Sequence, residues 1–493
     1  MKPYLALVGL VPFIVLFTGL VATRFKSYVT GLVTLGIAAL LSFFVWHTPL
    51  SVVGFSALEG FLIALLPIIW VIFAAVFTYH ISVETGAMEV IKARLREITP
   101  DLNVQAVLIA FCLGGFLESV AGFGTAVAIP TAMLMSLGFH PVRSAVISLV
   151  ANSVPVAFGA LGIPVIVLAK ITSLDLALLT KYVALQLAPF AFLVPLALLF
   201  LANGGLKGLR RSVWDTLLIG FSFTLVQTVV ALFVGPELVA VAGSLSSLAL
   251  YAVYRRIVSR SPGSGNGELF VAVINYLILL VLVLVTRLAD ISAFKTYPFV
   301  LNIPVGAHSF TIDWLTTPGT LLFISAVSGG MIQKLRAKSL VVIMKKTALK
   351  MAPSALTIIS IVALAKVMGY SGMILSVAAG ITAVSGAGYP LIAPVLGALG
   401  TFVTGSDTSS NILLGELQKN AALNTGYSPE WISASNTAGA TAGKMISPQS
   451  ISVAASTVGI RQEREIIRET IWFCLGYAVV LGIYIQIAAL IMK

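Results

Sequence analysis

The sequence predicts an all-α polytopic membrane protein that contains two inverted copies of one helical unit. Three observations predict this fold: the hydropathy, an internal repeat and the placement of the basic residues. Of the 493 residues, 59% are hydrophobic and only 10% are charged, and the mean hydropathy is +1.05. Soluble domains carry about 25% charged residues. Apolar runs near the ~20 residues needed to cross a bilayer recur along the whole chain.

The repeat consists of glycines, prolines and small polar residues that recur at a nearly constant separation. The first matched pairs lie 286 positions apart and the later ones 284. They include Pro67 with Pro353, Thr85 with Ser371, Gly114 with Gly400, Asn152 with Asn436, Ser153 with Thr437, and Pro164 with Pro448. So many matches in register indicate a duplication. Duplicated apolar units interrupted by Gly and Pro are typical of secondary transporters, whose substrate site lies where the copies meet.

The net charge of +12 comes from basic residues that gather between the apolar runs. The clusters are Arg24 and Lys26; Lys92, Arg94 and Arg96; Lys207, Arg210 and Arg211; Arg255, Arg256 and Arg260; the basic residues of 334–350; and Arg461, Arg464 and Arg468. Basic loops mark the cytoplasmic side of a membrane protein. This placement predicts a multi-pass protein of the cytoplasmic membrane and argues against a nucleic-acid partner.

In chain order, the hydropathy predicts transmembrane helices at 3–23, 28–46 and 59–80, a helical hairpin within 101–137, and a broken helix at 142–170. Further helices are predicted at 181–202, 214–233, 237–254, 268–286, 316–333 and 349–367. A second hairpin within 386–424, a second broken helix at 430–458 and a last helix at 469–491 complete the chain. With every basic cluster inside, these segments give about 12 transmembrane helices plus two hairpins, and both termini are external.

The two copies are predicted to have opposite orientations in the membrane. The first helix of copy one, 59–80, runs inward, whereas its counterpart at 349–367 runs outward. The linker at 89–97 is charged and its counterpart at 373–384 has no charge, as expected if only the first faces the cytoplasm. The predicted divisions are N-terminal helices at 1–58, repeat 1 at 59–170, intervening helices at 171–344, repeat 2 at 345–458 and a C-terminal helix at 459–493.

Two stretches place one carboxylate among Gly, Ser and Thr in otherwise apolar sequence. They are GGFLESVAGFGTAVAIP at 114–130 and GTFVTGSDTSSNILLG at 400–415. Unwound backbone at membrane depth is tolerated only where protein or a water-filled cavity satisfies it. We therefore expect two hairpins whose tips reach the middle of the membrane. The tip residues expected to contact substrate are Gly122 and Gly124 in the first hairpin and Thr408, Ser409 and Ser410 in the second.

Each hairpin is followed by an interrupted helix, ANSVPVAFGALGIP at 151–164 and SNTAGATAGKMISPQS at 435–450. Helix breaks leave free N–H groups, and these attract anions. We expect the breaks at Asn152, Ser153, Asn436 and Thr437, which occupy matching positions in the two copies. Their amides and hydroxyls are suited to holding a carboxylate and a hydroxyl. The alternative is that small residues let helices pack closely while polar side chains bond across them.

Three ionisable residues, Glu118, Asp407 and Lys444, are predicted to lie deep in the membrane. A charge at mid-bilayer costs at least ~2.5–3.5 kcal/mol, so such residues are functional by default. They do not occupy equivalent positions in the two copies, and asymmetric charge suits coupling to an ion. We expect Glu118 or Asp407 to carry a proton and Lys444 to face an anionic substrate. The alternative is a static buried ion pair.

The sequence carries no motif of an enzyme or of a bound cofactor. No His, Cys and Asp cluster has the spacing of metal ligands, and no G-x-S-x-G or Walker motif occurs. We therefore expect no metal and no cofactor, with protons as the coupling ion. The expected partners are a small carboxylate substrate and the lipid bilayer. The oligomeric state stays open, a homo-oligomer included.

The motifs FLESVAGFGTAVAI, ANSVPVAFGALGIP, TGSDTSSN and GKMISPQS closely resemble those of the L-lactate permeases of bacteria and archaea, a family that includes glycolate permeases. The resemblance runs along most of the chain. It implies proton-coupled uptake of L-lactate, D-lactate and glycolate across the cytoplasmic membrane. Members usually show E-G-A-A-G-F-G where this chain has ESVAGFG at 118–124, a change that concerns the exact substrate. The alternatives are a sodium-coupled carboxylate symporter and, from another class, a channel or a membrane sensor.

Overall fold

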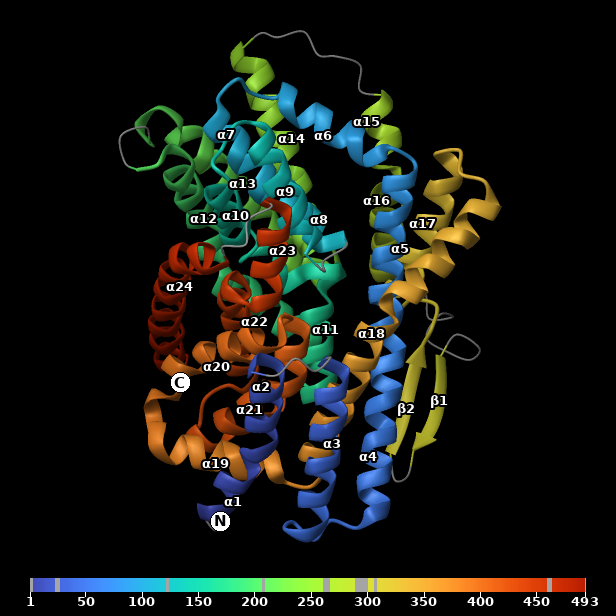
Figure 1. Ribbon diagram of the computed structural model, residues 1–493, viewed down its shortest axis with the longest axis vertical. Helices are drawn as coiled ribbons and strands as arrows, with labels where there is room; N and C mark the ends of the chain where they lie inside the picture. The colour runs from blue at the N-terminus through green and yellow to red at the C-terminus, as the bar shows by residue number, and fades with distance from the viewer. Residues whose placement is uncertain are drawn as a thin grey trace.

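The computed structural model describes residues 3–22, 27–120, 124–205, 209–259, 267–288, 300–305, 308–458 and 463–492. Its regular structure in these residues is helical except for one antiparallel pair of strands, β1 (Val300–Val305) and β2 (His308–Asp313) (Figure 1). The helical class predicted from hydropathy is therefore confirmed, but the strand pair was not predicted. Its two strands, VLNIPV and HSFTID, are rich in β-branched residues, which favour strands.

The chain begins with α1 (Pro3–Gly9), α2 (Val11–Ala22), α3 (Ser27–Phe44) and α4 (Leu50–Ile63). Helix α4 continues through the π-helical turn η1 (Ala64–Ile69) into α5 (Trp70–Glu84). One helical rod thus covers 50–84, longer than the predicted helix at 59–80, and the division expected at residue 59 falls inside α4. Leu66 leaves the helical region within η1, so the rod is kinked there.

The remainder of copy one consists of short helices in close succession. They are α6 (Ala87–Glu97), α7 (Leu102–Val107), η2 (Leu108–Leu113), α8 (Gly114–Val120), α9 (Thr125–Ser136), α10 (Pro141–Ala151), η3 (Pro155–Phe158) and α11 (Gly159–Thr172). Helix α8 packs against α9, as expected for a hairpin. Gly122, predicted at the hairpin tip, lies outside the described residues, whereas Gly124 directly precedes α9.

The intervening helices are α12 (Leu176–Asn203), α13 (Leu209–Phe233), η5 (Pro236–Leu238), α14 (Val239–Ser259), α15 (Gly267–Ala272), α16 (Ile274–Leu288) and α17 (Pro318–Ile332). Copy two contains α18 (Ala337–Tyr370), α19 (Met373–Ser385), η7 (Gly386–Gly388), α20 (Tyr389–Thr404), α21 (Asp407–Thr425), α22 (Pro429–Ile446) and α23 (Pro448–Val458), and α24 (Glu463–Ile491) follows. Helix α18 is bent by 47° between Ala337–Pro353 and Ala355–Tyr370. Lys338, Lys345 and Lys346, predicted to lie in a loop, therefore lie on the first part of α18.

The first broken helix breaks where the sequence predicts, but the second breaks at a different residue. In copy one, α10 ends at Ala151 and the chain turns at Asn152, as expected. In copy two, α22 runs unbroken through Asn436 and Thr437, so the break predicted there is wrong. The interruption comes at Ser447, which is extended, with a ψ of 136°. The cause is Pro448, because proline pushes the residue before it out of the helical conformation.

Seven described helices are long and apolar enough to cross a membrane, or eight if the two parts of α18 form one span. The expected number of about 12 is therefore not confirmed. Two of the seven, Leu102–Val120 and Pro155–Thr172, are almost entirely surrounded by protein. These two contain the π-helical turn η2 and the irregular start of α11, which fits the rule that irregular backbone at membrane depth is buried in protein.

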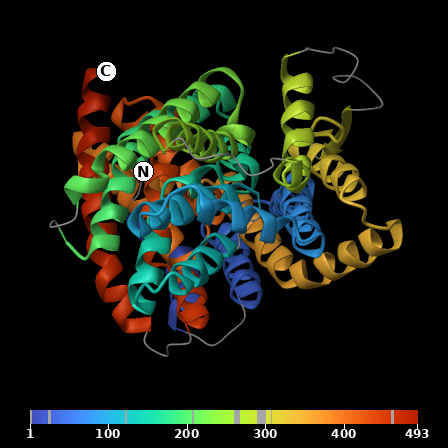
Figure 2. The same ribbon diagram turned by 90° about the horizontal axis from the view of Figure 1, so that it is seen from above.

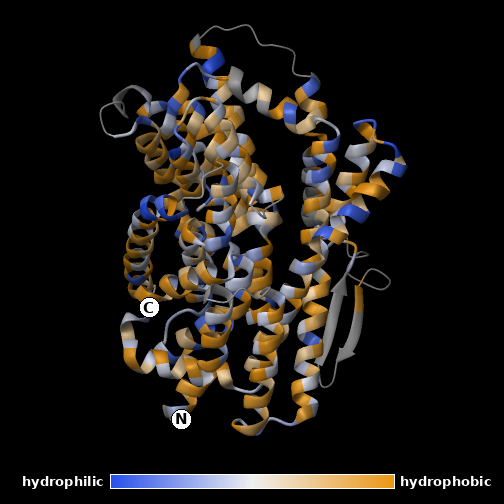
Figure 3. Ribbon diagram, viewed as in Figure 1, coloured by the Kyte–Doolittle hydropathy of each residue, from blue (hydrophilic) through white to orange (hydrophobic). Residues whose placement is uncertain are grey.

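The helices form one bundle with a smaller group on one side. In the bundle, α20, α21, α22 and α24 pack on one another, and α11 packs against α21 (Figure 1). The yellow and gold segments, which include α16 and α17, lie to one side when seen from above, and α17 packs against α5 (Figure 2). Hydrophobic residues dominate the outer helices α3, α4 and α24 (Figure 3). Helix α24 exposes Trp472, Val479 and Ile487, as expected for a face that meets lipid.

Candidate substrate site

A cavity of about 100 Å³ is lined by residues of both segments that the sequence predicts to be copies of one unit. The first predicted copy contributes α5, α8, η3 and α11. The second contributes α18, the turn that joins α20 to α21, and the helices α21, α22 and α23. One water needs about 10–15 Å³ of such space, so the cavity has room for several waters or one small solute. The meeting of the two copies is where the repeat predicted a site.

The three deep charges predicted from the sequence all line this cavity. Glu118 comes from α8, Asp407 from the first turn of α21 and Lys444 from α22. Their side chains are 4%, 2% and 9% exposed. The charge of Lys444 interacts with both carboxylates. If all three groups are ionised, two negative charges and one positive charge give the cavity a net charge of −1.

Lys444 does not form a closed ion pair with either carboxylate. Its Nζ donates a hydrogen bond of 2.5 Å to the carbonyl of Gly405, in the turn at the tip of hairpin two. Both oxygens of Asp407 and Oε2 of Glu118 have no hydrogen-bond partner among the described residues. Buried acceptors are rarely left in this state, and an exception points to a ligand or a bound proton. The geometry therefore disfavours the static ion pair.

Close backbone approaches bring these groups together. Gly405 has a φ of +72°, and a methyl group there would overlap the side chain of Gln449. Gly159 lies against Glu118, because an added Cβ would come within 3.0 Å of Oε1. Side chains larger than hydrogen would thus displace either the hairpin tip or the carboxylate. Position 405 favours glycine for its backbone conformation and its close contact, whereas at Gly159 the Glu118 carboxylate would have to shift by a few tenths of an ångström.

The other predicted substrate ligands divide into two groups. Thr408 and Ser409 line the cavity with the three charges. Ser410, Ser153, Asn436 and Thr437 are buried but are not part of the cavity lining, and Gly124 packs on Val453 of α23. Asn152 is buried and is not part of the lining either.

Directly behind the cavity lies a buried amide network that the sequence analysis missed. Asn411 of α21 is its centre: Nδ2 donates to the Pro164 carbonyl at 3.0 Å and to Thr437 Oγ1 at 2.8 Å. Asn411 Oδ1 accepts from Asn436 Nδ2 at 2.9 Å. Because Pro164 lines the cavity, the network connects α21 and α22 to its wall. Its signal in the sequence is the helical spacing of Asp407, Asn411 and Gln418, which share one face of α21.

The network continues away from the cavity. Gln418 Nε2 donates to Asn436 Oδ1 at 3.0 Å and accepts, through Oε1, a hydrogen bond of 2.7 Å from the hydroxyl of Tyr389. Asn436 and Thr437 therefore act within this structure as partners of Asn411. Both side chains make these hydrogen bonds from an unbroken helix α22.

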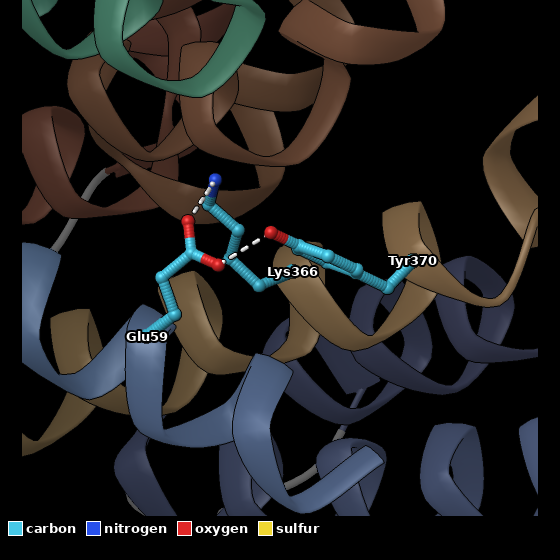
Figure 4. A network of polar contacts seen from close by, with 3 residues as sticks. All are labelled: Glu59, Lys366 and Tyr370. Atoms are coloured by element: carbon cyan, nitrogen blue, oxygen red, sulfur yellow. Dashed lines mark hydrogen bonds and ion pairs between the residues drawn. The ribbon is translucent and has the colours of Figure 1, made fainter. Parts of the chain in front are cut away.

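A second group of charged residues lies away from the cavity lining. Glu59 of α4 forms an ion pair of 2.9 Å with Lys366 of α18 and accepts a hydrogen bond of 2.7 Å from Tyr370 (Figure 4). Both charged side chains are mostly buried, with exposed fractions of 13% and 17%, so loss of one partner would leave the other charge buried and unpaired. Their position joins α4 to α18.

A helical membrane protein in which hairpins and interrupted helices enclose a charged cavity has the build of a membrane transport protein. The model of the L-lactate permease family matches residues 5–492. The chain therefore belongs to this family, which is one of permeases and not of enzymes, and it is a multi-pass membrane protein.

Individual relatives agree with the family model. An L-lactate permease of Streptococcus iniae is 37% identical over 447 residues, which cover 87% of this chain and 93% of that protein. An L-lactate permease of Bacillus subtilis is 36% identical, covering 94% and 92% of the two chains. A glycolate permease, GlcA, of Escherichia coli is 34% identical, covering 97% and 94%. The solved YdaH transporter of Alcanivorax borkumensis aligns over 89% of this chain and 87% of its own at 17% identity, but a TM-score of 0.45 is too low to bear on the fold.

Proposed function

We propose that this protein carries L-lactate and related small 2-hydroxymonocarboxylates, D-lactate and glycolate among them, across the cytoplasmic membrane together with protons. The observation that carries the proposal is the cavity, which is lined by one ammonium group and two carboxyl groups and is the size of a small solute. Three of the four carboxyl oxygens have no hydrogen-bond partner among the described residues. The names of the related permeases, for L-lactate and for glycolate, support this substrate class.

In the proposed bound state, the substrate carboxylate takes the place of the Gly405 carbonyl as the partner of Lys444. Charge-assisted hydrogen bonds are about twice as strong as neutral ones, so a carboxylate is the better acceptor. The hydroxyls of Thr408 and Ser409, at the N-terminus of α21, are suited to the substrate hydroxyl. Asn411 and its partners hold the wall behind these groups.

Charge balance supports coupling to protons. With Glu118, Asp407 and Lys444 all ionised, a bound monocarboxylate would change the net charge of the cavity from −1 to −2. Burying an uncompensated charge costs several kcal/mol. Uptake of one proton by Glu118 or Asp407 brings the net charge back to −1, so anion and proton stabilise each other in the site. One proton per monocarboxylate makes transport electroneutral, whereas a second proton would add about 2.3 kcal/mol per 100 mV.

We further propose alternating access, in which the two hairpins and the two broken helices open the cavity to one side of the membrane at a time. The repeat at a nearly constant separation supports two inverted copies that exchange shapes. The proposed topology keeps the basic clusters in the cytoplasm and both termini external.

Uptake of labelled L-lactate into proteoliposomes tests the proposal under three separate drives: an inward proton gradient, an inward sodium gradient, and voltage alone. Accumulation with the proton gradient only is the expected result. Accumulation only with sodium would replace protons by sodium as the coupling ion, an alternative that the relatives' names do not support. Flux that never exceeds equilibrium would indicate a channel, and binding without flux would indicate a sensor.

A further inference from the structure

Part of the cavity lining is apolar and forms what is called here the apolar wall. Ile72 of α5, Ile163 of α11 and Ile358 of α18 line it and belong to one cluster of buried apolar side chains. The charged groups Glu118 and Lys444 line the same cavity. A solute in the cavity therefore meets hydrocarbon as well as the charged groups of Glu118 and Lys444.

Two of these isoleucines occupy equivalent positions in the two copies. Ile72 and Ile358 are 286 positions apart, the same separation as Pro67 and Pro353. Each follows an irregularity in its rod, the turn η1 before Ile72 and the bend in α18 before Ile358. Helices α5 and α18 pack against each other (Figure 1). The repeat thus brings two matched side chains to one cavity, whereas the charges have no such symmetry.

We propose that Ile72 and Ile358 contact the methyl group of lactate and so set the preference of this carrier for lactate over glycolate. The inference rests on the proposed function. Lactate and glycolate share the carboxylate and the adjacent hydroxyl, and they differ only in the methyl group that glycolate lacks. The ionic wall meets the same groups in both substrates, so only the apolar wall distinguishes them. One missing carbon in an apolar pocket changes relative rates about 10- to 200-fold.

The test compares initial uptake of L-lactate and glycolate by the full-length protein in proteoliposomes under one proton gradient. The readout is the ratio of kcat/KM for the two substrates, in the wild type, Ile72→Ala and Ile358→Ala. The matched control is Ile361→Ala, because Ile361 lies on the same helix α18 and in the same apolar cluster but does not line the cavity. We expect the ratio to fall about 10-fold in the two cavity variants and to stay at its wild-type value in the control.

A ratio that stays unchanged in both cavity variants would overturn the inference, and so would a wild type that prefers glycolate. General damage to the fold lowers uptake of both substrates together and leaves the ratio alone. Should either alanine variant fail to fold, Ile72→Val and Ile358→Val, which remove one carbon, test the same ratio. A longer substrate, 2-hydroxybutyrate, should gain relative to lactate in the enlarged cavities. A wild type that transports neither lactate nor glycolate would instead refute the proposed function itself.

Discussion

Replacing Lys444 by methionine removes the one basic side chain that lines the cavity among the residues that the structure describes. Methionine keeps much of the length of lysine and loses its charge. A hydrogen bond to a charged group contributes about 1.5–3 kcal/mol, and each 1.4 kcal/mol is tenfold in affinity. We therefore expect Lys444→Met to raise the KM for L-lactate about 10- to 150-fold, with a smaller change in the amount of folded protein.

The assay is the initial rate of L-lactate uptake into proteoliposomes as a function of substrate concentration. Binding of lactate to the detergent-solubilised protein, followed by calorimetry, separates a loss of affinity from a loss of movement. Lys419→Met is the matched control, because Lys419 lies on α21 and also donates to a carbonyl, that of Thr172 at 2.6 Å, but does not line the cavity. Equal KM values for the two variants would refute an anion-binding role of Lys444.

Other variants test the remaining parts of the site. Either Glu118→Gln or Asp407→Asn removes the proposed proton carrier. That variant should lose proton-driven accumulation of lactate but keep the exchange of internal for external lactate. Normal accumulation by both variants would contradict the proposed coupling. Gly405→Ala should slow uptake, because a methyl group at a φ of +72° would overlap Gln449; wild-type rates would exclude that close approach. Asn411→Ala leaves its buried partners unsatisfied at about 1–3 kcal/mol each, so we expect a lower Tm in detergent; an unchanged Tm would count against a stabilising network.

The charged part of the site could be predicted from the sequence, because charge in apolar sequence has few explanations. Glu118, Asp407 and Lys444 stand out against their surroundings, and a buried charge is too costly to keep without a role. The structure places all three at one cavity between the copies. Their roles in binding and coupling stay predictions.

The amide groups were harder to interpret, because an amide in apolar sequence has two explanations. It serves a ligand at a helix break, or it bonds to a neighbouring helix. Asn436 was assigned to a break, yet its partner Asn411 satisfies it across α21 and α22. Only the three-dimensional neighbours of a side chain decide between these two cases. The proline at 448, whose effect on the backbone is local, was the better guide to the break.

The apolar wall of the cavity could not be predicted, because its residues do not stand out from the rest of the sequence. Isoleucine is common throughout this chain, and nothing local distinguishes Ile72 or Ile358 from residues that face lipid or pack in the core. Their equivalence in the repeat is visible in the sequence. It gains meaning only when the structure shows that both side chains reach the same cavity.

The two helix breaks differ in conformation, and this difference bears on the resting state of the carrier. In α11, Ala160 and Leu161 have φ angles of 43° and 61°, in the left-handed region. That conformation costs a residue with a side chain roughly 1–2 kcal/mol. Ser447, at the break in copy two, is extended and carries no such cost.

Suppose that during transport each copy adopts the backbone conformation of the other. The free-energy cost of this change would then differ between the two breaks, because their sequences differ. The inward-facing and outward-facing forms of the empty carrier would then differ in free energy, and each 1.4 kcal/mol is a tenfold difference in population. Although its halves are similar in sequence, the empty protein would therefore hold its site open mainly to one side of the membrane. The preferred orientation of the empty protein would then depend on a few strained backbone angles and not on the gradient that drives transport.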